Sequence, residues 1–198
     1  MNLPNKITTS RIILSVLLLI FLILPYDQMG INMPIYLVAG SVKISLKYII
    51  AGIVFVIAAV TDFIDGKLAR KNNMVTDYGK VMDAIADKIL VNGVLIIFAY
   101  YKLIPVIIPV IIITRDTFVD SIKMVAGKNG KVVAASFIGK AKTMTMMIGI
   151  TLVFFSNLPF EIIGLRIADL LLIIATILSL ISGCQYFLVN KDFILKDK

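Results

Sequence analysis

The sequence predicts an all-α, polytopic membrane protein with six transmembrane helices and both termini in the cytoplasm. Three observations lead to this prediction: the composition, the length of the apolar runs and the uneven distribution of basic residues. The 198 residues are 60% hydrophobic with a mean hydropathy of +1.00, whereas soluble domains are nearer half apolar. We therefore expect a single membrane domain over residues 1–198, without a separate soluble domain.

Six apolar runs define the expected spans, because each approaches the roughly 20 residues that a transmembrane helix needs. The first contains IILSVLLLIFLIL, and similar runs recur as far as the C-terminus, so we interpret it as a span rather than a cleaved signal peptide. The segment 26–45 contains Pro and Gly and is a candidate to lie in the membrane interface. The spans are expected near 10–25, 46–70, 81–101, 104–125, 142–157 and 162–188.

The basic residues set the orientation of these spans. In this arrangement four of the 20 Lys and Arg residues fall outside: Lys43, Lys47, Lys102 and Arg166. Positively charged loops are retained in the cytoplasm, so both termini are expected there. The net charge of +8 follows from this topology and favours attraction to anionic lipid. Nothing in the sequence indicates nucleic-acid binding.

The chain has no histidine and a single cysteine, Cys184. It therefore has no intrachain disulfide and no thiolate metal cluster, and we interpret Cys184 as a small apolar residue of the last span. Any general base at neutral pH has to be a carboxylate, a lysine or a tyrosine.

Five aspartates occur in DFIDGKLARKNNMVTDYGKVMDAIAD, which lies between two strongly apolar runs. Asp77 is expected in the polar loop KNNMVTDYG, off the face of the others. The other four fall on two helical faces that should meet at the cytoplasmic ends of antiparallel spans: Asp62 with Asp65, and Asp83 with Asp87.

Four facing carboxylates require positive charge between them. Arg70 and Lys88 are the nearby candidates and supply too little of it, so one or two divalent cations are expected. Ligands that offer only oxygen favour Mg²⁺, Mn²⁺ or Ca²⁺ over Zn²⁺. The small residues Gly66, Ala69 and Gly79 would let a ligand come close. The competing interpretation is that these aspartates are solvated helix ends or pair with scattered Lys and Arg.

The spacing D-x2-D-G-x2-A-R-x8-G-x3-D-x3-D, from Asp62 to Asp87, resembles the motif of the CDP-alcohol phosphotransferase family at every fixed position. The six-helix architecture of that family would cover nearly the whole chain. The resemblance implies that Asp62, Asp65 and Asp83 ligate two divalent ions, Mg²⁺ or Mn²⁺, and that Asp87 is the general base and also touches metal. It further implies a CDP pocket lined by Gly66, Ala69, Arg70 and Gly79, with Arg70 on the diphosphate.

The same resemblance implies the substrates and the location. The donor would be CDP-linked, in bacteria usually CDP-diacylglycerol, and CMP would be released. The stretches LPNKITTSR, ITRD at 113–116 and GKAKTMTMM from Gly139 resemble those of bacterial members that make phosphatidylglycerophosphate, so glycerol 3-phosphate is the expected acceptor. We expect a homodimer in the bacterial inner membrane, with the active site open to the cytosol and to lipid.

Basic residues of the fourth and fifth spans are candidates to bind the acceptor's phosphate. A buried guanidinium calls for a partner or an anionic ligand, so Arg115 is a candidate together with Lys140 and Lys142. The lysines could instead serve topology alone. Asp116 is expected to point about 100° away from Arg115 around the helix. Arg115 could instead form an ion pair with one of three carboxylates: Asp116, Asp120 or Asp169.

Several alternatives stay open at this point. Thr8 and Arg11 could cover the site from the N-terminal segment or simply anchor it in the interface. Inositol phosphate would fit the same basic residues, and serine and phosphatidylglycerol are further possible acceptors. A divalent-cation transporter would place ionisable residues near the midplane and carry half-repeats, neither of which is apparent. A non-catalytic scaffold with a structural metal gives no reason for Arg70, Gly79 and Arg115.

Overall fold

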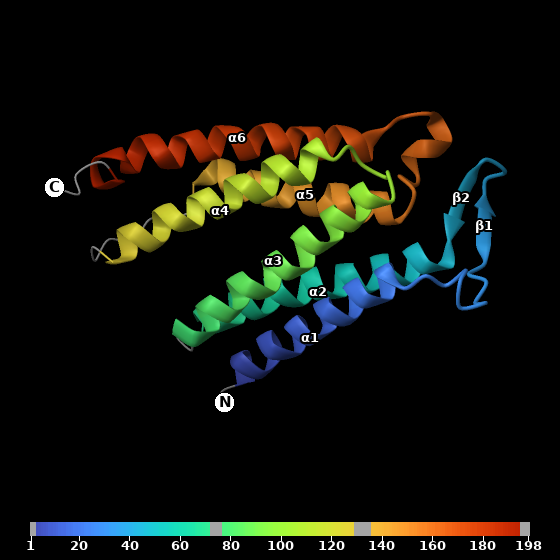
Figure 1. Cartoon of the computed structure of the whole chain (residues 1–198), viewed down its shortest axis with the longest axis horizontal. Coiled ribbons are helices and arrows are strands. Elements are labelled where there is room, and N and C mark those ends of the chain that lie inside the picture. Colours follow the sequence, from blue (N-terminus) through green and yellow to red (C-terminus); the bar gives the residue numbers. More distant parts are fainter. Residues whose placement is uncertain (1–2, 72–76, 129–135, 195–198) are drawn as a thin grey trace.

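The computed structural model describes residues 3–71, 77–128 and 136–194, and within these ranges the chain forms a bundle of six long helices (Figure 1). Each predicted span overlaps one of these helices, and the ends differ by up to seven residues, the largest difference being at the start of α1. A short 3₁₀ helix, η1 (Phe160–Ile163), lies between the last two. The helices are α1 (Leu3–Ile23), α2 (Leu46–Lys71), α3 (Asp77–Tyr100), α4 (Ile107–Lys128), α5 (Phe137–Phe154) and α6 (Ile167–Ile194).

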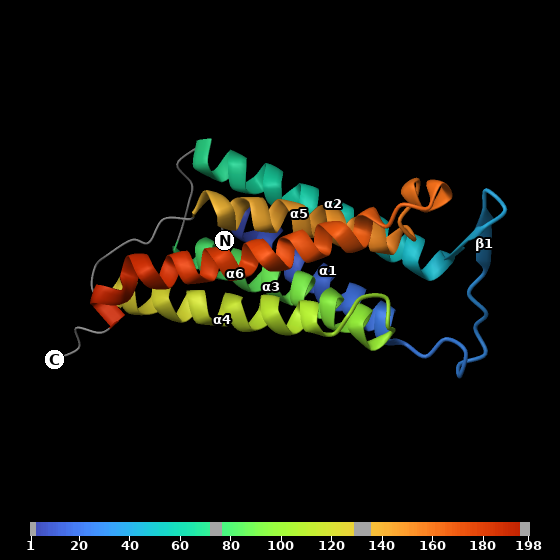
Figure 2. The same ribbon diagram turned by 90° about the horizontal axis from the view of Figure 1, so that it is seen from above.

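The two ends of the described chain lie at the same end of the bundle, as two perpendicular views agree (Figures 1 and 2). The C-terminal end of α2 and the first turns of α3 lie at this end too, whereas the α3–α4 connection and η1 lie at the opposite end. The aspartate motif occupies the last turns of α2 and the first turns of α3. The motif therefore lies at the end of the bundle that carries both termini.

The outward faces of the helices are apolar, and small polar residues lie inside. On α6, Ser179 and Ser182 are fully buried. Among the described residues, two segments are long and apolar enough to cross a membrane by length and composition, Phe137–Phe154 and Ile167–Lys191. Outward apolar faces with small polar residues between helices are the distribution expected in lipid. The half-exposed residues of α6 include Leu170, Ile173, Ile177, Leu180 and Ile181.

Three phenylalanines pack α2, α3 and α5 together in the core. Phe55, Phe98 and Phe154 are fully buried, and the ring centroid of Phe154 lies 5.5 Å from that of Phe55 and 4.7 Å from that of Phe98. Gly52 permits this close packing, because a Cβ atom there would lie 2.9 Å from the Cβ of Phe154. The absence of a side chain at this one position thus sets the separation of α2 from α5.

The segment 26–45 contains a β-hairpin, so the expectation of a purely α-helical chain is wrong here. Strands β1 (Ile35–Val38) and β2 (Val42–Ser45) pair antiparallel, with Val38 opposite Val42. The turn between them has positive φ angles at Ala39 (51°) and Gly40 (73°), as a tight hairpin turn requires. The hairpin lies at the end of the bundle away from the termini (Figure 1).

The expectation that Asp77 lies in a loop is also wrong. Helix α3 begins at Asp77, two residues before Gly79. The first turn of a helix leaves N–H groups unpaired and carries a partial positive charge, so an acidic residue is favourable there. Helical periodicity alone had placed Asp77 off the common face, but it does not define where the helix begins.

We expect Gly52→Ala to destabilise the bundle. The new methyl group would meet the fully buried Phe154, and overpacking of this kind costs about 1–3 kcal/mol. The measurement is the thermal unfolding midpoint in detergent. Gly127→Ala is the matched control, because a Cβ at Gly127 of α4 has nothing within 4 Å. Equal midpoints for the two variants would contradict this account of the packing.

Candidate active site

Two aspartates of the motif share one arginine. Arg11 of α1 donates from Nη1 to Oδ1 of Asp62 on α2, and from Nη2 to Oδ1 of Asp83 on α3 at 3.0 Å. Thr8, one turn earlier, donates from its hydroxyl to the same oxygen of Asp83 at 2.7 Å. One face of α1 therefore joins carboxylates that come from two other helices.

Arg11 is only 5% exposed, whereas the side chains of Asp62 and Asp83 are 43% and 44% exposed. A buried guanidinium is costly unless it is paired, and here two carboxylates pair with it. Its Nε is buried without a hydrogen-bond partner among the described residues. The view that nearby positive charge is limited to Arg70 and Lys88 is therefore wrong, because Arg11 supplies it from α1.

Asp87 lies one turn after Asp83 on α3 and is half-buried. The charged groups that act on it come from α1, α3, α4 and α5, namely Arg11, Lys88, Asp116 and Lys142. Asp87 is therefore subject to the charge of Arg11 and also to the charges of a second group, which includes Asp116 and Lys142.

Several predicted site residues lie in α2 at positions whose side chains fall outside the described residues. This applies to Asp65, Gly66, Ala69 and Arg70, for which the structure gives only their place in the last turns of α2. Gly79 lies in the first turn of α3. The predicted CDP-binding residues thus lie at the end of α2 and at the beginning of α3, and their contacts stay a prediction.

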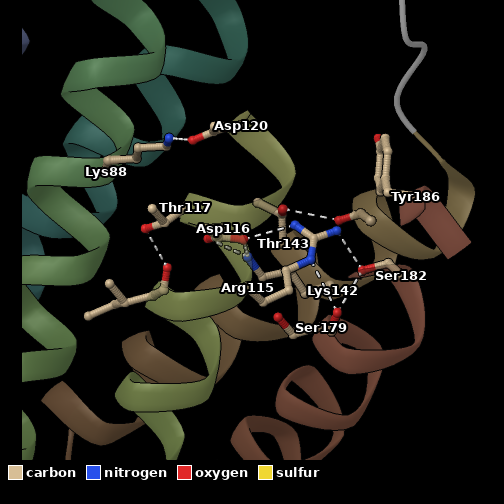
Figure 3. Close-up of polar contacts among 12 residues, drawn as sticks. Lys88, Arg115, Asp116, Thr117, Asp120, Lys142, Thr143, Ser179, Ser182 and Tyr186 are labelled. Atoms are coloured by element: carbon tan, nitrogen blue, oxygen red, sulfur yellow. Dashed lines mark hydrogen bonds and ion pairs between the residues drawn. The ribbon is translucent and has the colours of Figure 1, made fainter. Parts of the chain in front are cut away.

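The second group of charges lies between α4, α5 and α6 (Figure 3). Arg115 donates to Oδ1 of Asp116 at 2.9 Å, to the carbonyl of Ser179 at 3.1 Å and to the hydroxyl of Ser182 at 2.7 Å. Lys142 of α5 donates from Nζ to both carboxylate oxygens of Asp116, each at 2.8 Å. Asp116 therefore holds two cations that come from different helices.

Of the three carboxylates considered as partners of Arg115, Asp116 is the one that pairs with it. The two Cα positions do differ in direction around α4, but the arginine side chain is long enough for its guanidinium to reach the neighbouring carboxylate. Asp120 pairs instead with Lys88 of α3. The ion pair of Arg115 with Asp116, given above as an alternative role for Arg115, is therefore present in the structure. It leaves both Arg115 and Lys142 with N–H donors that could still bind an anion.

The two candidate lysines of α5 differ in environment. Lys142 is buried at 4% exposure, whereas Lys140 is exposed. They are two residues apart, which places them on different sides of the helix. Lys142 is therefore the better placed of the two to act together with Arg115.

The donor set of the aspartate motif fits a hard divalent cation, since it offers carboxylate oxygens without histidine or cysteine. Arg11 already marks a point where carboxylates of α2 and α3 share positive charge. Among the residues whose side chains are described, no three acidic, histidine or cysteine side chains are grouped closely enough to hold a metal. The side chain of Asp65, the second aspartate of the motif, is not among the described side chains.

Comparison with known proteins extends these observations. The profile of the family described as CDP-alcohol phosphatidyltransferase matches residues 1–181. The CDP-diacylglycerol–glycerol-3-phosphate 3-phosphatidyltransferase of Bacillus subtilis is 38% identical over 96% of this chain and 95% of its own length. Proteins with the same name are 30% identical in Rickettsia felis, over 97% of both chains, and 31% identical in Wigglesworthia glossinidia brevipalpis, over 96% of this chain and 94% of that protein.

The family match and the named relatives identify this helical bundle as a transferase of a membrane-bound family. The chain belongs to the CDP-alcohol phosphatidyltransferase family. This confirms the resemblance seen in the spacing of the motif from Asp62 to Asp87. The family generally depends on a divalent metal, in keeping with the oxygen-only donor set.

We expect Arg11→Ala to destabilise the metal-free protein, because Asp62 and Asp83 would lose their shared cation. These carboxylates are partly exposed, so the expected cost is about 1–2 kcal/mol rather than that of a fully buried pair. The measurement is the thermal midpoint in detergent with a chelator.

Arg11→Lys keeps the charge and should recover part of this loss. Arg166→Ala is the matched control, because the Arg166 side chain is 81% exposed and lies 3.9 Å from Asp169. If Arg11→Ala and Arg166→Ala melt at the same temperature, Arg11 does not hold the three helices together.

Proposed function

We propose that this protein transfers the phosphatidyl group of CDP-diacylglycerol to sn-glycerol 3-phosphate, giving phosphatidylglycerophosphate and CMP. The observation that carries the proposal is the 38% identity, over nearly the full length of both chains, with the Bacillus subtilis enzyme named for this reaction. The complete motif from Asp62 to Asp87 supports the same chemistry. The protein is thus an enzyme of phospholipid biosynthesis.

Asp87 is the group that accepts the proton of the acceptor hydroxyl. The hydroxyl oxygen attacks the phosphorus that carries diacylglycerol, the bond from this phosphorus to the CMP oxygen breaks, and CMP leaves with the electron pair. A positioned carboxylate accelerates such a step by proton removal, and holding the hydroxyl in line supplies a further gain. The half-buried setting of Asp87, one turn from Asp83, supports this role.

The carboxylates of the motif are the residues that would hold the metal, as two ions of Mg²⁺ or Mn²⁺ bound by Asp62, Asp65, Asp83 and Asp87. Bound there, the ions would neutralise charge on the diphosphate oxygens. The position of Arg11 supports this assignment, because it marks where carboxylates from two helices share one cation.

The substrates divide between two groups of residues. The CDP moiety is assigned to Gly66, Ala69, Arg70 and Gly79, with Arg70 on the diphosphate. The phosphate of the acceptor is assigned to Arg115 and Lys142, with Lys140 nearer the solvent. A phosphate dianion favours guanidinium and ammonium donors, and the burial of Lys142 supports a site that excludes water.

We assign six spans, with both termini and the active site on the cytoplasmic side of the bacterial inner membrane. The distribution of basic residues supports this topology, and so does the shared location of the motif and both chain ends in the bundle (Figure 1). This arrangement gives a water-soluble acceptor access from the cytosol and a lipid donor access from the bilayer. A homodimer is the assembly expected from the family alone.

The decisive experiment is CMP release by the purified protein in detergent with CDP-diacylglycerol and Mg²⁺, using one acceptor at a time. The acceptors are glycerol 3-phosphate, inositol phosphate, serine and phosphatidylglycerol. We expect release with glycerol 3-phosphate alone. Release with a different acceptor would keep the family chemistry and overturn the acceptor, whereas no release from folded protein would overturn the proposed activity.

We expect Asp87→Asn to lower CMP release by about 100-fold or more, because the amide cannot accept the proton. Binding of CDP-diacylglycerol, followed by its effect on the thermal midpoint, should change little. Asp120→Asn is the control, since Asp120 lies on α4 and pairs with Lys88. Turnover of Asp87→Asn near that of the wild type would rule out the assignment of the base.

A further inference from the structure

Asp116 is a carboxylate within the bundle with two cationic partners on different helices. Arg115 reaches it at 2.9 Å and Lys142 at 2.8 Å. The side chain of Asp116 is 18% exposed, that of Arg115 is 11% exposed and that of Lys142 is 5% exposed. At these exposures the ion pairs are poorly screened by water, so their geometry is held firmly. Figure 3 shows the three side chains converging between α4, α5 and α6.

The path of Arg115 is fixed along its whole length by α6. A Cβ atom at Gly183 would lie 3.0 Å from Cγ of Arg115, so the glycine makes room for the side chain. Ser179 and Ser182 accept from the guanidinium, and its centre lies 5.5 Å from the ring centroid of Tyr186. Asp116 binds the other end of the guanidinium, Nη1, and so holds it on the side of Lys142.

The charge of this group remains positive. Two cations share one carboxylate, which leaves a net charge of one positive unit among Arg115, Asp116 and Lys142. Each cation also has more N–H donors than these contacts use. The hydroxyl of Ser179 is buried and has no hydrogen-bond partner among the described residues. Arg115, Asp116 and Lys142 are therefore already paired with one another, and their remaining N–H donors and net positive charge could still bind an anion.

The group also lies close enough to Asp87 to influence it. Lys142 and Asp116 are both among the charges that act on Asp87. Lys88, the neighbour of Asp87 on α3, pairs with Asp120, which lies one turn from Asp116 on α4. An anion held by Arg115 and Lys142 would therefore lie near the assigned base. A phosphorylated alcohol has its phosphate and its hydroxyl a few bonds apart, which matches an anion site next to a base.

We propose that Asp116 is a positioning residue, which holds Arg115 and Lys142 side by side and thereby sets the preference of this enzyme for a phosphorylated acceptor. The inference rests on the proposed function and adds to it a residue that does not itself touch the phosphate. Asp116 repels the ligand's charge, so its contribution is geometric. Without it, two like charges would separate and the phosphate would have to bring them together again.

The test is Asp116→Asn, which keeps the shape of the side chain and removes its charge. We expect the KM for glycerol 3-phosphate to rise about tenfold, the effect of losing roughly one charge-assisted hydrogen bond. The KM for CDP-diacylglycerol should stay within about twofold, because the lipid donor does not use this group. Asp116→Glu should recover part of the affinity for glycerol 3-phosphate.

Asp120→Asn is the matched control, since it removes a carboxylate one turn further along α4 that pairs with Lys88. It should leave both KM values near those of the wild type. Ser182→Ala provides a second variant that removes only the hydroxyl contact of Arg115. We expect it to raise the KM for glycerol 3-phosphate by about threefold, and it carries the test if Asp116→Asn does not fold.

The outcomes separate the two proposals. A wild-type protein that releases no CMP with glycerol 3-phosphate overturns the proposed function. A wild-type protein that does release it, with variants whose two KM values stay unchanged or rise together, overturns the positioning role alone. A fall in the KM for glycerol 3-phosphate in Asp116→Asn would show that Asp116 screens the cations rather than positions them, and would also overturn the inference.

Discussion

The pairing of Arg11 with Asp62 and Asp83 is the interaction on which the arrangement of the first three helices depends. The guanidinium is buried, and removing it from water is tolerable only because two carboxylates meet it. Those carboxylates come from α2 and α3. Because Arg11 on α1 has to be paired with both of them, the three helices are held close together at this point. The end of the bundle that carries the aspartate motif is built around this requirement.

The two ionic groups have opposite composition. Around Arg11, two carboxylates share one cation, whereas around Asp116, two cations share one carboxylate. The first group therefore favours added positive charge and the second favours added negative charge. Asp87 is under the influence of both. This polarity suits the proposed reaction, in which two anionic substrates must approach each other with their charges compensated separately.

Much of this organisation could be predicted from local patterns, and the remainder depends on distance in the fold. The positions of the helices followed from the length of the apolar runs. The role of Arg11 was underestimated, since Asp62 lies 51 positions away in the sequence. The partner of Arg115 stayed open among Asp116, Asp120 and Asp169, because periodicity gives the direction of a Cα–Cβ bond and not the reach of a long side chain. The hairpin strands have only four residues each, too few for periodicity to distinguish them from a loop.

The location of Arg11 on α1 has a consequence for biogenesis. Helix α1 is synthesised before α2 and α3, so its arginine enters the insertion machinery without either of its carboxylate partners. Arg11 lies in the first half of α1, where a long basic side chain can keep its charge at the membrane interface until its partners are made. Its pairing with both Asp62 and Asp83 can form only after α2 and the first turns of α3 have been synthesised. The three helices therefore reach their final arrangement together rather than one after another.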